Sequence, residues 1–193
     1  MPRTESNPVE LGFQAPDFQL PDASGRLHGP GDHAGAPALL VAFISNRCPF
    51  VVGIREAFAD FARRNAPRGL RVIAINANDA EAHSEETLER LGLEATAFGY
   101  DFPYVKDETQ EVARAYGAAC TPDLFLFDAA QHLVYHGQFD GFRPNNGVTP
   151  TGESLQAAVD ALLAGEPPID RQVPSIGCNI KWRPETQAAV AAE

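Results

Sequence analysis

One junction constrains the fold of this chain more than any other: an apolar run that leads almost directly into Cys48-Pro49. The run, residues 38–45, is continuous and bounded by turn residues, which is typical of a strand buried on both faces of a sheet. Pro49 suits the first turn of a helix. Apolar residues then recur at helical spacing, at Phe50, Ile54, Phe58 and Phe61.

The remaining periodic segments extend this strand–helix start. The next apolar run, residues 70–76, predicts a parallel neighbouring strand reached by a right-handed crossover. Further on, the pattern predicts helices over 81–98, 108–116 and 154–163, a short extended piece over 102–106, and a hairpin of residues 124–128 and 133–138. The expected architecture is α/β, with a mixed central β-sheet and helices on both faces.

The 193 residues suit one domain with a sizeable core. Residues 1–11 are polar and predict a flexible N-terminal arm, whereas residues 12–165 hold the periodic segments and predict the domain itself. Residues 166–193 show little periodicity, yet they contain the single Trp and the third cysteine. We therefore expect a C-terminal tail that packs on the domain.

Composition excludes several classes of partner. The net charge of −11 argues against nucleic acid, because phosphate binding depends on Lys and Arg. No apolar run approaches the ~20 residues of a membrane-spanning helix, and the polar N-terminus is unlike a secretory signal. We therefore expect no membrane partner and a cytoplasmic location, where three cysteines are not structural disulfides.

Cys48 is the strongest candidate for chemistry. The thiolate is the reactive form of cysteine, and a helix N-terminus lowers the pKa of a thiol. A position after a buried strand places Cys48 at the carboxyl edge of the sheet, where α/β folds hold their sites. Arg47 adds a cation unless it points to solvent, and the Ser45 hydroxyl is a candidate donor to the sulfur or to a bound peroxide. The alternative for Cys48 alone is an inert buried cysteine.

A second motif, Cys120-Thr121-Pro122-Asp123, stands just before the strand predicted at 124–128. Proline cannot join a central ladder, so Pro122 marks the entrance of that strand, a place that suits a cis peptide bond. An ordinary trans proline in a loop is the alternative. The combination of this motif with Cys48 is more specific than either alone.

Together these segments resemble the peroxiredoxin-like (alkyl hydroperoxide reductase/thiol-specific antioxidant) subgroup of the thioredoxin superfamily. The matching stretches are residues 12–20, 41–50, Thr121-Pro122, 124–128 and the tail motif 176–182. The resemblance implies a thioredoxin-like fold in which Thr121 and Pro122 form a wall opposite Cys48. It also implies a thiol-dependent oxidoreductase that reduces peroxides or disulfides, with thioredoxin or glutathione as reductant.

The chain departs from both parent patterns. Peroxiredoxins have Pro-x-x-x-Thr/Ser-x-x-Cys, which Ser45 and Cys48 match, but Val41 stands at the proline position. The position of the peroxide-orienting arginine of that family falls near Pro122, where this chain has the thioredoxin-like proline instead. Thioredoxins have Cys-x-x-Cys, and here Val51 stands at the position of the second cysteine. A redox-sensing or non-catalytic binding module is therefore the alternative function.

An oxidised Cys48 needs a second thiol or an external reductant. Cys178 is our first candidate for the resolving thiol, because its tail motif belongs to the resemblance, and packing around Trp182 is its alternative role. Cys120 is the second candidate, and its alternative role is that of a buried spacer before the strand.

Other polar groups receive structural interpretations. His132 and His136 share one side of the hairpin strand, and we expect an exposed strand face there rather than a metal site. The dispersed cysteines lack zinc spacing, and no nucleotide-binding motif is present, so we expect no cofactor and no metal. The acidic run 79–89 predicts a solvent-exposed helix face.

Overall fold

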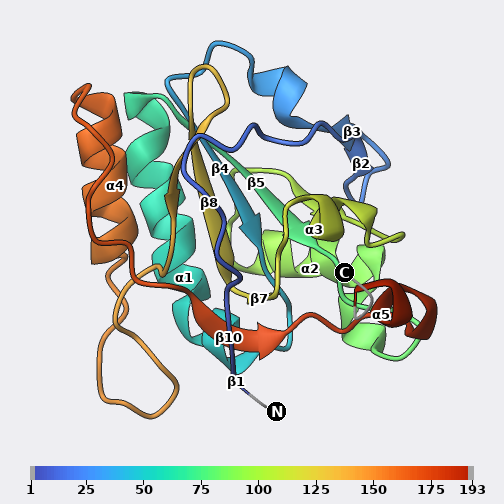
Figure 1. The fold of residues 1–193 in the computed structure, drawn as a ribbon. Coiled ribbons are helices and arrows are strands. Elements are labelled where there is room, and N and C mark those ends of the chain that lie inside the picture. Colours follow the sequence, from blue (N-terminus) through green and yellow to red (C-terminus); the bar gives the residue numbers. More distant parts are fainter. Residues whose placement is uncertain (1–2, 191–193) are drawn as a thin grey trace.

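The computed structural model describes residues 3–190 and is built around a five-stranded sheet (Figure 1). Its strands are β4 (Ala38–Phe43), β5 (Leu70–Asn76), β6 (Tyr104–Lys106), β8 (Asp123–Asp128) and β9 (Leu133–His136). The strand order is β6-β5-β4-β8-β9. β4, β5 and β6 run parallel to one another. β8 is antiparallel to β4, and β9 is antiparallel to β8. The mixed sheet predicted from the sequence is confirmed.

Helices cover both faces of this sheet. They are α1 (Pro49–Asn65), α2 (Leu88–Ala97), α3 (Glu111–Ala115), α4 (Glu153–Leu163) and the C-terminal α5 (Pro184–Val190), with short 3-10 turns η1 (Pro30–His33), η2 (Ala66–Arg68) and η3 (Ser84–Glu86). Side chains of α1, α2 and α4 join one apolar cluster, and those of α3 join another on the opposite face. The helix predicted over 81–98 is in fact divided into η3 and α2, because Thr87 between them has an extended backbone.

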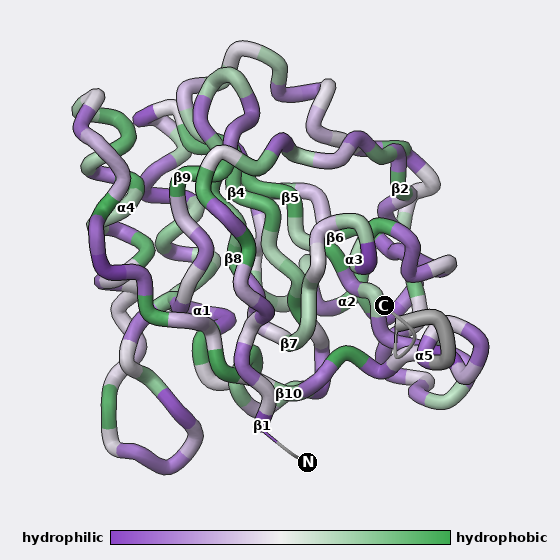
Figure 2. Tube along the Cα trace, viewed as in Figure 1, coloured by the Kyte–Doolittle hydropathy of each residue, from purple (hydrophilic) through white to green (hydrophobic). Residues whose placement is uncertain are grey.

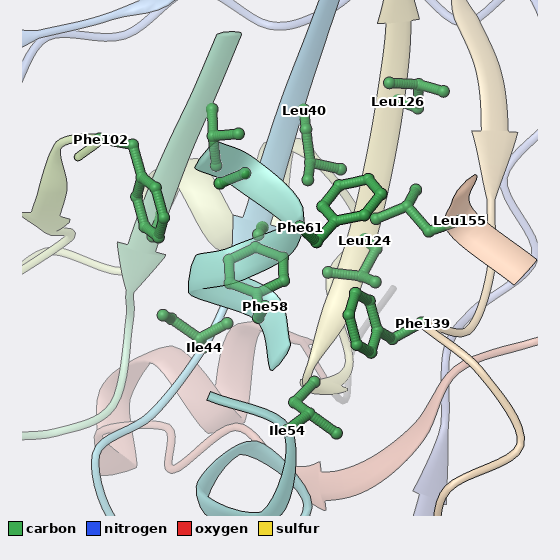
Figure 3. Close-up of a cluster of buried hydrophobic side chains, with 14 of the residues drawn as sticks. Leu40, Ile44, Ile54, Phe58, Phe61, Phe102, Leu124, Leu126, Phe139 and Leu155 are labelled. Atoms are coloured by element: carbon green, nitrogen blue, oxygen red, sulfur yellow. The ribbon is translucent and has the colours of Figure 1, made fainter. Parts of the chain in front are cut away.

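β4 separates two cores. Every residue of β4 is buried, with Leu40 in the cluster under α1 and Leu39 in the cluster under α3. Figure 2 shows the resulting hydrophobic stretch along β4 and β5. Figure 3 shows the first cluster, where the rings of Phe58 and Phe61 lie edge-on to Phe139, with centroids 5.8 and 5.7 Å apart. Such burial of aromatic rings fixes the position of α1 against the sheet.

A second, three-stranded sheet joins the two ends of the chain. Its strands, in the order β1-β10-β7, are β1 (Arg3–Glu5), β10 (Ile176–Asn179) and β7 (Cys120–Thr121), while β2 (Leu20–Pro21) and β3 (Leu27–His28) pair separately. Both contacts of β10 are antiparallel, with Cys178 opposite Arg3 on one side and Thr121 on the other. Residues 3–5 are thus a paired strand, which differs from the flexible arm expected for 1–11.

Gly177 permits the close approach of β10 to β7. A Cβ atom at this position would lie 1.9 Å from the carbonyl oxygen of Thr121, so no side chain fits. In Figure 1, β10 lies beside β7 at the end of the central sheet where β4 leads into α1. The tail is therefore held against the segment that precedes Pro122.

Candidate active site

Cys48 is the N-cap residue of α1 and has an extended backbone, after which Pro49 begins the helix. It is only 2% exposed. Its thiol donates a hydrogen bond to the carbonyl oxygen of Thr121, with 3.0 Å between sulfur and oxygen. The Thr121-Pro122 peptide bond is cis. The structure therefore brings together Cys48 and the Thr121-Pro122 segment from distant parts of the sequence.

The surroundings of Cys48 favour its thiolate. Its pKa is lowered from 9.0 to about 6, first because the thiol of Cys178 donates a hydrogen bond to the Cys48 sulfur. Burial acts in the opposite direction, while the Thr121 side chain and the amides of Val51 and Cys178 lower the pKa further. The Thr121 hydroxyl oxygen is buried and has no hydrogen-bond partner among residues 3–190, so its proton is available to a Cys48 thiolate.

The two candidate resolving thiols differ in direction. Cys178 is 4% exposed and belongs to the same apolar cluster as Cys48, and its interaction with the Cys48 side chain is the first cause of its own raised pKa. Cys120 is fully buried, and its thiol is directed to the carbonyl oxygen of Pro122 at 3.5 Å. Burial and the charge of Asp123 raise the pKa of Cys120. All three cysteines are free thiols.

Ser45 and Arg47 surround Cys48 in a different way from that expected. The Ser45 hydroxyl donates to Glu86 at 2.6 Å, so it does not donate to the sulfur. Its oxygen instead accepts the amide protons of Arg47 and Cys48, at 3.3 and 3.2 Å. The Arg47 guanidinium is hydrogen-bonded to His83 and is not among the groups that lower the Cys48 pKa. Ser45 therefore holds the backbone of the loop that leads to Cys48, and Arg47 directs its guanidinium to His83 rather than to the Cys48 sulfur.

The model of the AhpC/TSA family matches residues 11–136, a stretch that includes Cys48 and Thr121-Pro122. The chain belongs to this family. A curated relative, the thiol-disulfide oxidoreductase ResA of Geobacillus thermodenitrificans, is 30% identical over 125 residues, which is 65% of this chain and 67% of the relative.

Two solved structures resemble this chain over most of its length. A hypothetical protein of Sinorhizobium meliloti 1021 has a TM-score of 0.93 and 62% identity, covering 94% of this chain and 99% of that one. A thiol:disulfide interchange protein of the thioredoxin family from Chlorobium tepidum has a TM-score of 0.59 and 18% identity, covering 81% of this chain and 99% of its own. The fold is thioredoxin-like, and the chain is of the thiol oxidoreductase type.

The burial of one carboxyl group in this AhpC/TSA-family chain was not predicted from the sequence. Glu86 lies in the acidic run expected to face solvent, but it is fully buried and accepts the Ser45 hydroxyl and the Asn46 amide. The neighbouring Glu85 is exposed, as expected. The sequence pattern did not distinguish the buried Glu86 from the exposed Glu85, because it predicted one continuous helix where the structure has the short 3-10 turn η3.

The exposure predicted for His136 is also wrong. It is 8% exposed rather than part of an open strand face, because its ring stacks on Phe125 and hydrogen-bonds Asp123 at 2.8 Å. Within residues 3–190, no group of three His, Cys, Asp or Glu side chains is placed to hold a metal ion. Over the same range, no helix has the length and apolar character needed to cross a membrane.

Proposed function

We propose that this protein is a dithiol–disulfide oxidoreductase in which Cys48 is the nucleophile and Cys178 the resolving thiol. The observation that carries the proposal is that β10 places Cys178 directly opposite Thr121, whose carbonyl oxygen accepts the Cys48 thiol at 3.0 Å, and that both cysteines pack in one apolar cluster. A pKa of about 6 keeps Cys48 largely ionised at neutral pH, the form that attacks sulfur. The similarity to a thiol-disulfide oxidoreductase supports the same chemistry.

The reaction balances with these two thiols alone. The Cys48 thiolate attacks one sulfur of a substrate disulfide, forms a mixed disulfide with it and releases the other sulfur as a thiolate, which takes up a proton. Cys178 then gives up its proton to solvent and attacks the Cys48 sulfur, which releases the second substrate thiolate and closes a Cys48–Cys178 disulfide. Two electrons pass from the protein to the substrate. A thiol reductant of the thioredoxin or glutathione class restores both cysteines.

The raised pKa of Cys178 gives the two steps their order. The hydrogen bond to Cys48 is the first cause of that shift, and the Cys48 charge contributes to it as well. A mixed disulfide on Cys48 carries no charge, so both causes are removed once the first step is complete. Cys178 therefore becomes a better nucleophile only when there is a mixed disulfide to resolve.

The surroundings of Cys48 favour a disulfide over a peroxide as substrate. Cleavage of a peroxide places charge on a leaving oxygen, which a positioned cation stabilises. The guanidinium closest in sequence, that of Arg47, is instead hydrogen-bonded to His83. Exchange between sulfurs places the charge on a thiolate, which is the better leaving group. Because Cys48 and Cys178 are both buried, a substrate disulfide reaches Cys48 when β10 moves away from it.

The test is an acid-trapped map of disulfides after oxidation. Fully reduced wild-type, C178S and C120S proteins receive either oxidised glutathione or hydrogen peroxide, and mass spectrometry follows each cysteine. We expect a Cys48–Cys178 bond in the wild type and in C120S. In C178S we expect a Cys48–glutathione mixed disulfide that persists. Oxidised glutathione should act faster than peroxide.

Other outcomes separate the alternatives. A Cys48–Cys120 bond with full turnover in C178S would assign resolution to Cys120. Rapid oxidation by peroxide alone would indicate a peroxidase. A Cys48–Cys178 bond that neither thioredoxin nor glutathione reduces would indicate a redox-sensing module.

A further inference from the structure

Beneath the loop that carries Cys48 lies a carboxylate with no contact with solvent, that of Glu86. One of its oxygens accepts the Ser45 hydroxyl at 2.6 Å, and the other accepts the Asn46 amide at 3.2 Å. A carboxylate buried inside a protein is costly unless several donors satisfy it. The donors here come from the loop between β4 and α1, so the carboxylate and the loop fix each other.

The other donors to Glu86 come from β5 and the segment after it. The side-chain amides of Asn76 and Asn78 donate to the two carboxylate oxygens at 2.5 and 3.2 Å. The buried Lys106 ammonium donates to the side-chain oxygen of Asn76 at 3.0 Å, which turns the amide nitrogen of Asn76 toward Glu86. With four donors around it, Glu86 is an obligatory acceptor at every contact.

This acceptor fixes the polarity of Ser45. A serine hydroxyl has one proton, and here that proton goes to Glu86. The Ser45 oxygen is then left with lone pairs only, which accept the amides of Arg47 and Cys48. The amide of Cys48 is thereby held in one orientation at the start of α1, and the sulfur is held against Thr121.

We propose that Glu86 is a positioning residue for the thiol chemistry: by fixing the hydrogen-bond polarity of Ser45, it holds the Cys48 sulfur among its hydrogen-bond donors. This rests on the proposed function only in the identity of the reactive thiol. A glutamine at position 86 has one accepting oxygen and one NH2 group. Its NH2 group must face either the Ser45 hydroxyl or the Asn46 amide, and both of these groups now donate to Glu86. In the first orientation Ser45 loses its fixed polarity, and in the second the loop loses its anchor at Asn46. In both orientations Cys48 loses its fixed place.

The test compares E86Q with E85Q, a neighbouring exposed glutamate whose side chain takes no part in the network. The readout is the rate of Cys48 alkylation by iodoacetamide as a function of pH, with cysteine assignment by mass spectrometry. We expect E86Q to react about tenfold more slowly than wild type at pH 7 and to recover above pH 9, because its thiolate forms at higher pH. E85Q should follow the wild-type profile.

S45A and the double variant S45A/E86Q extend the test. S45A removes one of the four donors but keeps the carboxylate itself, and it should reproduce the shifted profile, so it also serves if E86Q does not fold. The double variant should show no further shift, because both changes remove the same coupling. A folded E86Q or S45A protein with an unshifted profile, whatever its thermal stability, would overturn the proposal.

The outcome is independent of the proposed reaction. Iodoacetamide reports on the Cys48 thiolate whether or not Cys178 resolves it. A shifted profile in E86Q together with no Cys48–Cys178 bond in the wild type would support the positioning role and refute the dithiol mechanism. The reverse pattern would do the opposite.

Discussion

Cys178 and Cys120 lie on the neighbouring strands β10 and β7 beside Cys48, yet their thiols point in different directions. Burial does not distinguish them, since both are almost completely covered. Direction does: Cys178 packs in the same apolar cluster as Cys48, whereas the Cys120 thiol is directed to the carbonyl oxygen of Pro122. In the proposed reaction, the direction of a thiol decides whether it can resolve Cys48, and burial alone does not.

Strand register is the origin of this difference. Successive side chains of a strand point to opposite faces, so Cys120 and Thr121 in β7 face opposite ways. Thr121 faces Cys48, and Cys120 therefore faces away from it. In β10, Cys178 is opposite Thr121 and Asn179 is opposite Cys120. Directly paired residues share a face of the sheet, which places Cys178 on the side of Cys48.

The strongest way to break the comparison is G177A. A Cβ atom at 177 would lie 1.9 Å from the Thr121 carbonyl oxygen, so β10 must shift away from β7. We expect the rate of Cys48–Cys178 bond formation with oxidised glutathione to fall by at least about tenfold, because near-contact geometry controls such steps. G141A is the matched control, since no atom lies within 4 Å of its Cβ position. Unchanged disulfide formation in G177A would show that the close approach of β10 is unnecessary.

Next in size is the effect of the two thiols on the Cys48 pKa. C178A removes the largest cause of the lowered value, so the pKa should rise from about 6 to well above 7. C120A should leave it close to its wild-type value, because Cys120 donates no hydrogen bond to Cys48. Thiolate absorbance near 240 nm against pH measures both. Equal shifts in the two variants would remove the distinction between Cys178 and Cys120.

The pH dependence of stability should separate Cys48 from Cys120. The pKa of Cys48 is lower in the folded chain, so its contribution grows as pH rises from about 6 toward 9 and is lost as pH falls to about 6. Burial raises the pKa of Cys120, so above about pH 9 it ionises only in the unfolded chain, and folding is disfavoured there. Urea unfolding of reduced wild-type protein, C48A and C120A at pH 6, 8 and 10 tests both signs. A wild-type advantage over C48A that shrinks from pH 6 to 8 would contradict the sign for Cys48, and a wild-type stability relative to C120A that does not fall from pH 8 to 10 would contradict the sign for Cys120.

The central fold followed from the sequence because its signals are local. Apolar runs gave β4 and β5, and the Cys48-Pro49 junction marked the start of α1. β1 and β10 are only a few residues long, and they pair with each other from opposite ends of the chain. Strands this short have no periodic pattern from which they could be predicted. Glu86 was unpredictable for the same reason: its partners come from other segments.

The smallest expected effect is that of T121V, which removes the Thr121 hydroxyl beside Cys48. The hydroxyl has no hydrogen-bond partner among residues 3–190 when Cys48 is a thiol, so an isosteric methyl group should change the unfolding free energy by less than about 1 kcal/mol at pH 5. When Cys48 is a thiolate, the hydroxyl becomes a donor, and T121V should raise the Cys48 pKa by less than C178A does. Absorbance titration and urea unfolding of the two variants measure these effects. A larger shift in T121V than in C178A would make Thr121 the principal donor, and the contrast between Cys178 and Cys120 would then concern resolution alone.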